Sequence, residues 1–255
     1  EETRVDGDVT VIRTEDTRYA LAYLSAAFFG HPAKKLKVIG ITGTKGKTTT
    51  TYLIKSILEK TGRRVGLVGT IEVIIGEKHI HANNTTPESY LLQQYFKEMA
   101  DAGLDTVVME VSSQGLKLHR TQGFLFDIGI FTNLEPDHIG PNEHESFEEY
   151  RECKSLLFRQ CKIGIVNVDD VHCSSIIKNH TCELETFGLS KKADLRAEDL
   201  ELVKGGGHIG VRFVAKGLMD FPVEVATPGR FSVYNALAAI AVCRHFQVEP
   251  DQIRQ

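Results

Sequence analysis

The sequence lacks the features that mark membrane proteins, nucleic-acid-binding proteins and secreted proteins. No stretch approaches the roughly 18 consecutive apolar residues that a transmembrane helix needs, and lysine and arginine are scattered rather than striped. With 30 basic and 34 acidic side chains, the net charge of −4 gives no reason to expect nucleic acid or a membrane as partner. No secretory leader is visible, and the chain starts with Glu1 rather than methionine, so we interpret it as a fragment.

Cysteine is also sparse, and its arrangement is uninformative for chemistry. The five residues form no C-x-x-C pair and are odd in number. This pattern favours reduced, structural thiols in a cytoplasmic protein, with a catalytic cysteine as the less favoured alternative. The remaining composition, 42% hydrophobic and 25% charged over 255 residues, is typical of a globular chain long enough for one large core.

Apolar runs of strand length alternate with amphipathic segments of helix length, which predicts an α/β fold with a mostly parallel sheet flanked by helices. The expected strands cover residues 38–42, 65–69, 106–111, 127–132 and 163–168. The expected helices cover residues 48–61, 87–102, 147–161 and 231–246, the third of them with Ser146 as N-cap. Near residues 195–226 the pattern changes to short strands, expected at 200–203, 208–214 and 221–225, which predicts a small antiparallel section.

Both ends of the sequence differ from this rhythm. Residues 1 to about 35 contain one or two strand-like runs and a helical stretch at 18–29, too little for a core of their own. At the other end, Pro250 is expected to start a helix that Gln255 would cut off after one turn. We therefore expect further sequence on both sides.

The most informative motif is a glycine-rich loop between the first expected parallel strand and the helix after it. It reads Gly43-Thr44-Lys45-Gly46-Lys47-Thr48-Thr49, and Ile41 stands where the strict phosphate-loop pattern has a further glycine. Backbone N–H groups in such a loop, with the positive end of the helix, bind anionic phosphates. Lys47 is expected to reach the β- and γ-phosphates and Thr48 to coordinate Mg²⁺, so ATP chemistry is the leading hypothesis.

Polar side chains also follow two other expected strands, at the edge where open α/β sheets bind ligands. Glu110 and Ser112 end one strand, and Asn133, Asp137 and His138 follow the next. A carboxylate and an imidazole there could hold magnesium. Taken singly, Glu110 could equally cap a helix or face solvent, and His138 could be an ordinary surface histidine.

Lys154 lies on the apolar side of the helix expected over residues 147–161. It comes four residues after Tyr150 and three before Leu157, on a stripe that includes Phe147 and Cys161. Burial would lower its pKa and leave a neutral amine that can take up CO₂ as a carbamate, an anion suited to orienting magnesium. The alternative, which periodicity alone favours, is a lysine that extends its ammonium group to solvent.

Five strings in this order resemble the Mur ligase family. They are residues 41–49, Asn84-Thr85-Thr86-Pro87, residues 109–113, residues 131–134 with Asp137-His138, and residues 234–239. The resemblance covers essentially the whole chain and is strongest to members that add the third amino acid of the peptidoglycan stem peptide. Each string alone is weak, but five in register, with Lys154 at the proper distance downstream, identify the family.

The resemblance implies three domains. Residues 1–35 would be a remnant of the N-terminal UDP-binding domain and residues 36–255 the central ATP-binding domain, with the C-terminal amino-acid-binding domain absent. It further implies a cytoplasmic enzyme, expected to be a monomer, that uses ATP and Mg²⁺ on UDP-N-acetylmuramoyl dipeptide and an amino acid. We expect this chain alone to fold and bind nucleotide, but not to catalyse the ligation.

The resemblance also implies roles for individual residues. Lys47, Lys154 and His138 would be catalytic. Residues 43–49 and Asn235 would bind the nucleotide, with Asn235 on adenine. Metal ligands would be Thr48, Glu110, His138 and Lys154 as its carbamate, and the muramoyl dipeptide would be held by Thr85, Thr86, Ser112 and Arg120. Hydroxyl groups and a guanidinium suit a diphosphate and a carboxylate.

The implied reaction transfers the γ-phosphoryl group of ATP to the terminal carboxylate of the dipeptide, and the amino acid then attacks the acyl phosphate. Neutralising charge would be the main task of the protein. No Ser/His/Asp nucleophilic set is evident, because no glycine elbow surrounds Ser112 and Ser113. Gly140 and Ser232 depart from the family pattern, near the expected magnesium and adenine contacts respectively. Alternatives are a ligase like folylpolyglutamate synthetase and a non-catalytic nucleotide-binding module.

Overall fold

The central feature of the described part of the chain is one sheet of eleven strands. The computed structural model describes residues 7–137, 139–140, 143–205 and 208–254. Across the sheet the strand order is β11-β10-β9-β8-β7-β6-β1-β5-β2-β3-β4. In chain order the strands are β1 Lys37–Thr42, β2 Val65–Val68, β3 Glu72–Ile75, β4 Lys78–His81, β5 Thr106–Glu110, β6 Phe126–Phe131, β7 Cys161–Asn167, β8 Glu183–Gly188, β9 Leu195–Gly205, β10 His208–Gly217 and β11 Phe221–Val225.

The middle of the sheet is parallel and both edges are antiparallel. Strands β2, β5, β1, β6, β7, β8 and β9 pair in parallel, with Ile39 opposite Val108 on one side and Ile128 on the other. The three expected strands of the antiparallel section are present as β9, β10 and β11, and they extend the main sheet through β8. Strands β3, β4 and β8 were not predicted. The predicted fold class is confirmed.

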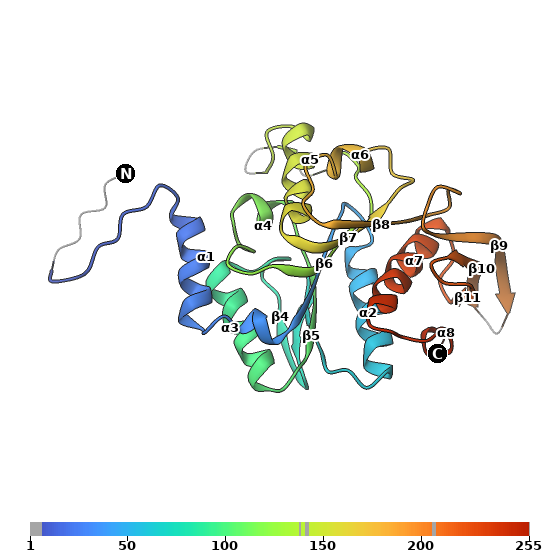
Figure 1. Ribbon diagram of the computed structural model, residues 1–255, viewed down its shortest axis with the longest axis horizontal. Coiled ribbons are helices and arrows are strands. Elements are labelled where there is room, and N and C mark those ends of the chain that lie inside the picture. Colours follow the sequence, from blue (N-terminus) through green and yellow to red (C-terminus); the bar gives the residue numbers. More distant parts are fainter. Residues whose placement is uncertain (1–6, 138, 141–142, 206–207, 255) are drawn as a thin grey trace.

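Helices cover both faces of the sheet (Figure 1). They are α1 Thr17–Phe28, α2 Lys47–Lys60, α3 Ser89–Asp101, α4 Ser113–Lys117, α5 Phe147–Ser155, α6 Cys173–Ile176, α7 Arg230–His245 and α8 Pro250–Ile253, with 3₁₀ turns at Pro32–Lys35 and Leu156–Arg159. Alternate side chains of the strands point to opposite faces. Ile39 packs in one core with α2 and α7, whereas Val38 packs in a second core with α3, α4, α5 and α6. Helix α1 lies outside this second layer, against α3.

The expected helix over residues 147–161 is shorter than predicted. Ser146 caps α5 by accepting a hydrogen bond from the Glu149 N–H, as expected, but the α-helix ends at Ser155. A 3₁₀ turn follows, and Cys161 begins β7. The predicted apolar stripe therefore included the first residue of a strand as if it belonged to the helix. The two could not be told apart by pattern because both bury apolar side chains in the same core.

Two further expectations concern the ends and the thiols. Between residue 7 and β1 the structure has α1 and a 3₁₀ turn but no strand, so the strand-like runs expected there do not form within the described residues. All five cysteines are free thiols, four of them buried. No helix within the described ranges is long and apolar enough to cross a membrane.

The sheet order brings the predicted polar clusters together. Strand β1 lies between β5 and β6, so the loop after β1 has Glu110 at the end of β5 on one side and the segment after Phe131 of β6 on the other. Carboxyl ends of adjacent parallel strands meet at one edge of a sheet. This edge is therefore the candidate site.

Candidate functional site

The loop from Gly43 to Gly46 turns the chain from β1 into α2. Both glycines have positive φ, +153° and +85°, and a Cβ atom on Gly46 would lie 2.5 Å from the Asn235 Oδ1 atom. Within the described part of the chain no side chain caps α2. The positive end of the helix is therefore open toward the loop, which is the arrangement that binds an anion.

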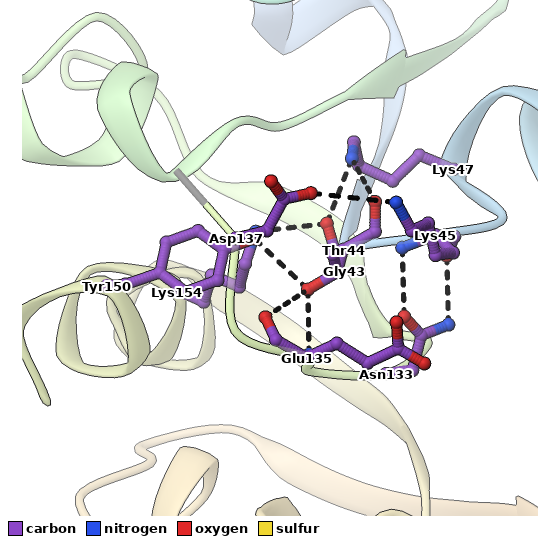
Figure 2. A network of polar contacts seen from close by, with 9 residues as sticks. All are labelled: Gly43, Thr44, Lys45, Lys47, Asn133, Glu135, Asp137, Tyr150 and Lys154. Atoms are coloured by element: carbon purple, nitrogen blue, oxygen red, sulfur yellow. Dashed lines mark hydrogen bonds and ion pairs between the residues drawn. The ribbon is translucent and has the colours of Figure 1, made fainter. Parts of the chain in front are cut away.

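The side chain of Lys47 folds back over this loop (Figure 2). Its Nζ donates to Gly43 O at 2.9 Å and to Thr44 O at 3.2 Å. Burial lowers the pKa of Lys47, while the nearby Glu110 and Asp137 carboxylates act in the opposite direction. The ammonium group is thus held at the mouth of the loop by carbonyl oxygens, contacts that an incoming phosphate could replace.

Asn133 holds the loop from the side of β6. Its Oδ1 accepts from the Lys45 N–H and its Nδ2 donates to Lys45 O, both at 2.9 Å, as Figure 2 shows. The Lys45 side chain points away from these contacts and lies 3.6 Å from the Asp137 carboxylate. Asn133 was predicted in the polar cluster, and the structure places it as a support of the loop backbone.

Glu110 joins the loop to the neighbouring strand ends. This carboxylate is 1% exposed, and its Oε1 accepts from the Thr48 hydroxyl at 3.0 Å and from the Thr70 N–H at 2.9 Å. Its Oε2 accepts from the Thr70 hydroxyl, which in turn lies 3.0 Å from the Thr85 hydroxyl. Thr70 follows β2 and was not predicted. Only the sheet order places it beside Glu110.

The other predicted substrate residues continue this network. The Thr86 hydroxyl donates to Glu110 O at 3.1 Å and accepts from the Ser112 N–H at 2.9 Å. Arg120 donates to Thr86 O at 3.0 Å and pairs with Glu88 at 2.6 Å. Ser112 Oγ accepts from Gly115 N–H and caps α4. The hydroxyls of Thr86 and Ser112 are thus engaged in backbone contacts beside the site.

Lys154 reaches the loop from α5. It is 2% exposed, its Nζ donates to Gly43 O at 3.0 Å, and the same atom lies 4.4 Å from the centre of the Tyr150 ring. Burial, followed by the repulsion of Lys47, holds the pKa of Lys154 well below its usual value. The alternative in which this ammonium extends to solvent is therefore wrong.

Tyr150 and Thr44 form a further polar contact between α5 and the loop. Their hydroxyl oxygens lie 3.1 Å apart, and burial raises the pKa of Tyr150 to about 12. The Thr44 hydroxyl also accepts from the Glu135 N–H at 3.0 Å. Tyr150 was predicted only as a member of the apolar stripe. The structure gives it a polar contact with the loop.

Asn235 approaches the loop from the other face of the sheet, on α7. It is 7% exposed, and its Oδ1 accepts from the Thr50 hydroxyl at 3.3 Å. The preceding Tyr234 lines an open pocket with Asp169 and Arg230, and its hydroxyl donates to Asp169 at 3.0 Å. A pocket with an aromatic ring and polar groups beside a phosphate loop suits a nucleoside.

Among the described residues, one predicted residue makes no side-chain contact at the site. Thr49 is exposed in the first turn of α2. His138 lies outside the described residues. The structure otherwise joins the predicted residues into one set around the loop.

The structure also brings together a serine, a histidine and a glutamate that the sequence did not predict to be neighbours. His144 Nε2 lies 2.8 Å from Ser113 Oγ, and its Nδ1 lies 3.4 Å from the Glu149 carboxylate, which pairs with Lys117 at 2.6 Å. Ser113 is 4% and His144 0% exposed, so this hydroxyl is shielded from solvent. Burial lowers the pKa of His144. The set is a buried contact between the start of α4 and α5, not a nucleophilic centre.

Oxygen atoms at the loop fit a magnesium ion. In the described ranges no group of three or more His, Cys, Asp or Glu side chains is arranged to hold a metal. Magnesium commonly takes only one or two protein oxygens and fills its other positions with water and phosphate oxygens. The adjacent Thr48 hydroxyl and Glu110 carboxylate meet that requirement.

Comparison with known proteins agrees with this geometry. The family model for the Mur ligase middle domain matches residues 41–243. A relative from Clostridium acetobutylicum, UDP-N-acetylmuramoyl-L-alanyl-D-glutamate–2,6-diaminopimelate ligase 1, is 43% identical over 96% of this chain and 50% of its own length. The relative of that activity from Bacillus licheniformis is 42% identical over 94% of this chain and 50% of its own. The chain thus spans about half the length of the curated relatives it matches.

Solved structures show the same architecture. The structure of a UDP-N-acetylmuramoyl-L-alanyl-D-glutamate–2,6-diaminopimelate ligase superposes with a TM-score of 0.83 at 27% identity, covering 94% of this chain and 50% of that one. Folylpolyglutamate synthase from Mycobacterium tuberculosis, solved with ADP and AMPPCP, gives 0.70 at 15% identity, covering 93% of this chain and 61% of that one. At that identity the second match shows the fold alone.

Proposed function

The chain belongs to the Mur ligase family, and we propose that it is the ATP-binding part of a ligase that joins 2,6-diaminopimelate to UDP-N-acetylmuramoyl-L-alanyl-D-glutamate in peptidoglycan synthesis. The names of the relatives support the choice of substrates. The observation that carries the proposal is the convergence of Lys47, Lys154 and Glu110 on one glycine-rich loop at the start of α2.

The loop and α2 would bind the triphosphate of ATP. The open N-terminus of α2 directs N–H groups at the phosphates, and Lys47 exchanges its two carbonyl contacts for phosphate oxygens. Asn235 and the pocket beside Tyr234 would receive the adenosine portion. In this arrangement the γ-phosphate would lie near the end of β5.

Thr48 and Glu110 would hold magnesium, together with His138 and the carbamate of Lys154 by analogy with the family. When bound, the ion neutralises phosphate charge and orients the γ-phosphoryl group. The neutral amine expected for a buried Lys154 is the form that reacts with CO₂. Its position on Gly43 O would put a carbamate next to the loop.

In the proposed reaction, an oxygen of the dipeptide carboxylate attacks the γ-phosphorus of ATP, and ADP leaves. The amino group of the second substrate then attacks the acyl carbon and forms the amide bond. The bond between the acyl carbon and the bridging oxygen breaks, inorganic phosphate leaves with that oxygen, and the nitrogen releases a proton. Two anions must approach in the first step, so positive charge at the loop lowers the barrier. Thr85, Thr86, Ser112 and Arg120, which are linked by hydrogen bonds beside Glu110, would orient the dipeptide.

The experiment separates nucleotide binding from ligation. Titration calorimetry of this chain with AMP-PNP and Mg²⁺ should give saturable binding to one site. In the protein that carries this chain, phosphate release should require UDP-muramoyl dipeptide, ATP and diaminopimelate together. Absence of binding by the chain would overturn the proposal at its base.

Two other functions are distinguished by the same assays. Phosphate release with a folate and glutamate, but not with UDP-muramoyl dipeptide, would indicate a folylpolyglutamate-type ligase. Nucleotide binding without phosphate release under any substrate pair would indicate a binding module. Replacing diaminopimelate by lysine tests the choice of amino acid.

A further inference from the structure

A second polar cavity lies at the opposite edge of the sheet from the phosphate loop. It has a volume of about 500 Å³ and is bordered by the amino ends of strands β1 and β6 and by the 3₁₀ turn Pro32–Lys35. We call this cavity the amino-edge groove. Five basic and two acidic side chains line it, although the whole chain carries a net charge of −4.

Some of these charges form a row across adjacent strands. In sheet order the row reads Lys162, Asp127, Lys37, Asp105 and Arg63. Asp127 lies 2.7 Å from Lys162 and 3.4 Å from Lys37, and its other oxygen accepts from the Val38 N–H. Burial raises the pKa of Asp127, but the bonds from Lys162 and Val38 and the two lysine charges outweigh it and lower that pKa overall. One carboxylate therefore serves two lysines, which leaves positive charge in excess.

Two further lysines add to that excess. Lys34 and Lys35 are exposed in the 3₁₀ turn, and neither has an ion-pair partner among the described residues. Arg63 is already engaged, by Asp105 at 3.5 Å and by the Phe246 ring at 4.7 Å. The positive charge available to a ligand is therefore concentrated at Lys34, Lys35 and Lys37.

The groove also contains a buried amide that lacks a partner. Gln93 on α3 is 1% exposed, and within the described part of the chain neither its Oε1 nor its Nε2 makes a hydrogen bond. Such a group costs free energy unless something pairs with it. Gln93 borders the groove, and once its amide turns toward the groove a hydroxyl group of a ligand can pair with both amide atoms.

We propose that the amino-edge groove binds a small phosphate monoester that carries hydroxyl groups. The phosphate lies against Lys34, Lys35 and Lys37, since compact ammonium groups suit a phosphate, and a hydroxyl of the ligand pairs with Gln93. The site is separate from the phosphate loop. Strand β1 connects the two, since Lys37 is its first residue and the loop follows its last.

Site-resolved NMR tests the proposal. Amide resonances of the intact chain are followed at low ionic strength during titration with ribose 5-phosphate and, separately, with inorganic phosphate. Saturable shifts are expected at residues 34–37 and 123–127, with the ester binding more tightly. Shifts at residues 43–49 report the phosphate loop independently, so failure of one site does not obscure the other.

Two variants and one control complete the test. Lys34→Ala/Lys35→Ala should weaken both ligands about tenfold. Lys178→Ala/Lys204→Ala, which removes two exposed lysines elsewhere, should not. Gln93→Leu should weaken only the ester and leave the free energy of unfolding unchanged or higher, because an unpaired amide is lost.

The proposal is overturned if the groove resonances do not saturate, or if the control pair weakens binding as much as the groove pair. Equal affinity for both ligands, unaffected by Gln93→Leu, would also overturn the monoester assignment and show a site for inorganic phosphate only. A marked loss of stability in Gln93→Leu would assign this amide a structural role instead.

Discussion

Lys47 and Lys154 donate hydrogen bonds to the same carbonyl oxygen, that of Gly43, at 2.9 and 3.0 Å. Two ammonium groups on one acceptor repel each other, and burial disfavours charge on both. Lys154 is the more buried of the two and its pKa is held well below the usual value. The pair therefore favours one charged and one neutral amine, as the proposed phosphate and carbamate roles require.

The first prediction concerns Lys154 and stability. Its folded-state pKa lies below that of the unfolded chain, so between these two values the unfolded chain binds more protons and stability rises with pH. Lys154→Met removes the titrating amine and with it this dependence of stability on pH. In CO₂-free buffer, urea unfolding should show the variant gaining stability over the native chain at pH 7 and losing part of that advantage at pH 9.5. A difference that does not vary with pH would contradict the lowered pKa.

The second prediction concerns Lys154 and catalysis. In the protein that carries this chain, Lys154→Ala should lower ligation by about 100-fold, because the variant cannot form the proposed carbamate that would orient the magnesium ion. A short-chain carboxylic acid added to the assay should restore part of the rate by standing in for the carbamate. Ligation at the native rate, or a loss that no acid restores, would argue against a carbamate.

The third prediction concerns Lys47. Replacing it by alanine removes a charged hydrogen-bond donor from the phosphate loop, so calorimetry should show AMP-PNP binding weakened by about 10- to 100-fold. Lys178→Ala removes an exposed lysine far from the loop in sequence and serves as the control. Equal affinities in the two variants would place the triphosphate elsewhere.

The fourth prediction separates two reasons for a glycine at position 46. Gly46 directly precedes helix α2 and Gly62 follows its C-terminal end. The two glycines have similar φ angles, +85° and +87°, but of the two only Gly46 would bring a Cβ atom within 4 Å of another atom. Gly62→Ala should cost about 1–2 kcal/mol of unfolding free energy from backbone strain alone. Gly46→Ala should cost more, because Asn235 must also move, and should weaken nucleotide binding. Equal costs in urea unfolding would show that the contact with Asn235 is unimportant.

The fifth prediction concerns the buried His144. Burial lowers its folded-state pKa below 6.5, so the unfolded chain binds more protons in that window and acidification through it destabilises the fold. His144→Gln keeps a polar side chain but does not titrate. Between pH 7.5 and 5.5 the native chain should therefore lose more stability than the variant. That range stays above the ordinary pKa of Glu149, whose folded pKa is lowered to about 2, chiefly by Lys117. Parallel losses would mean that the pKa of His144 is the same in the folded and the unfolded chain.

The local features of this protein could be predicted from its sequence. The phosphate loop and α2 follow from glycine spacing and the amphipathic pattern, and the core strands follow from apolar runs, because both depend on residues close together in the chain. Errors occurred where local signals were weak or ambiguous. Short edge strands such as β4 are mostly exposed, and the stripe ending at Cys161 joined a helix to a strand.

Contacts between distant residues were decided only by the tertiary structure. Whether Lys154 is buried depends on how α5 packs against the loop after β1, and Lys154 is 111 positions from its hydrogen-bond partner Gly43 in the sequence. Periodicity alone favoured the solvent-exposed alternative. Thr70 joins Glu110, and His144 joins Ser113, for the same reason. Sequence patterns specify which face of an element is apolar, whereas strand order and register determine which polar groups meet across elements. That order placed the loop between β5 and β6 and thereby assembled the site.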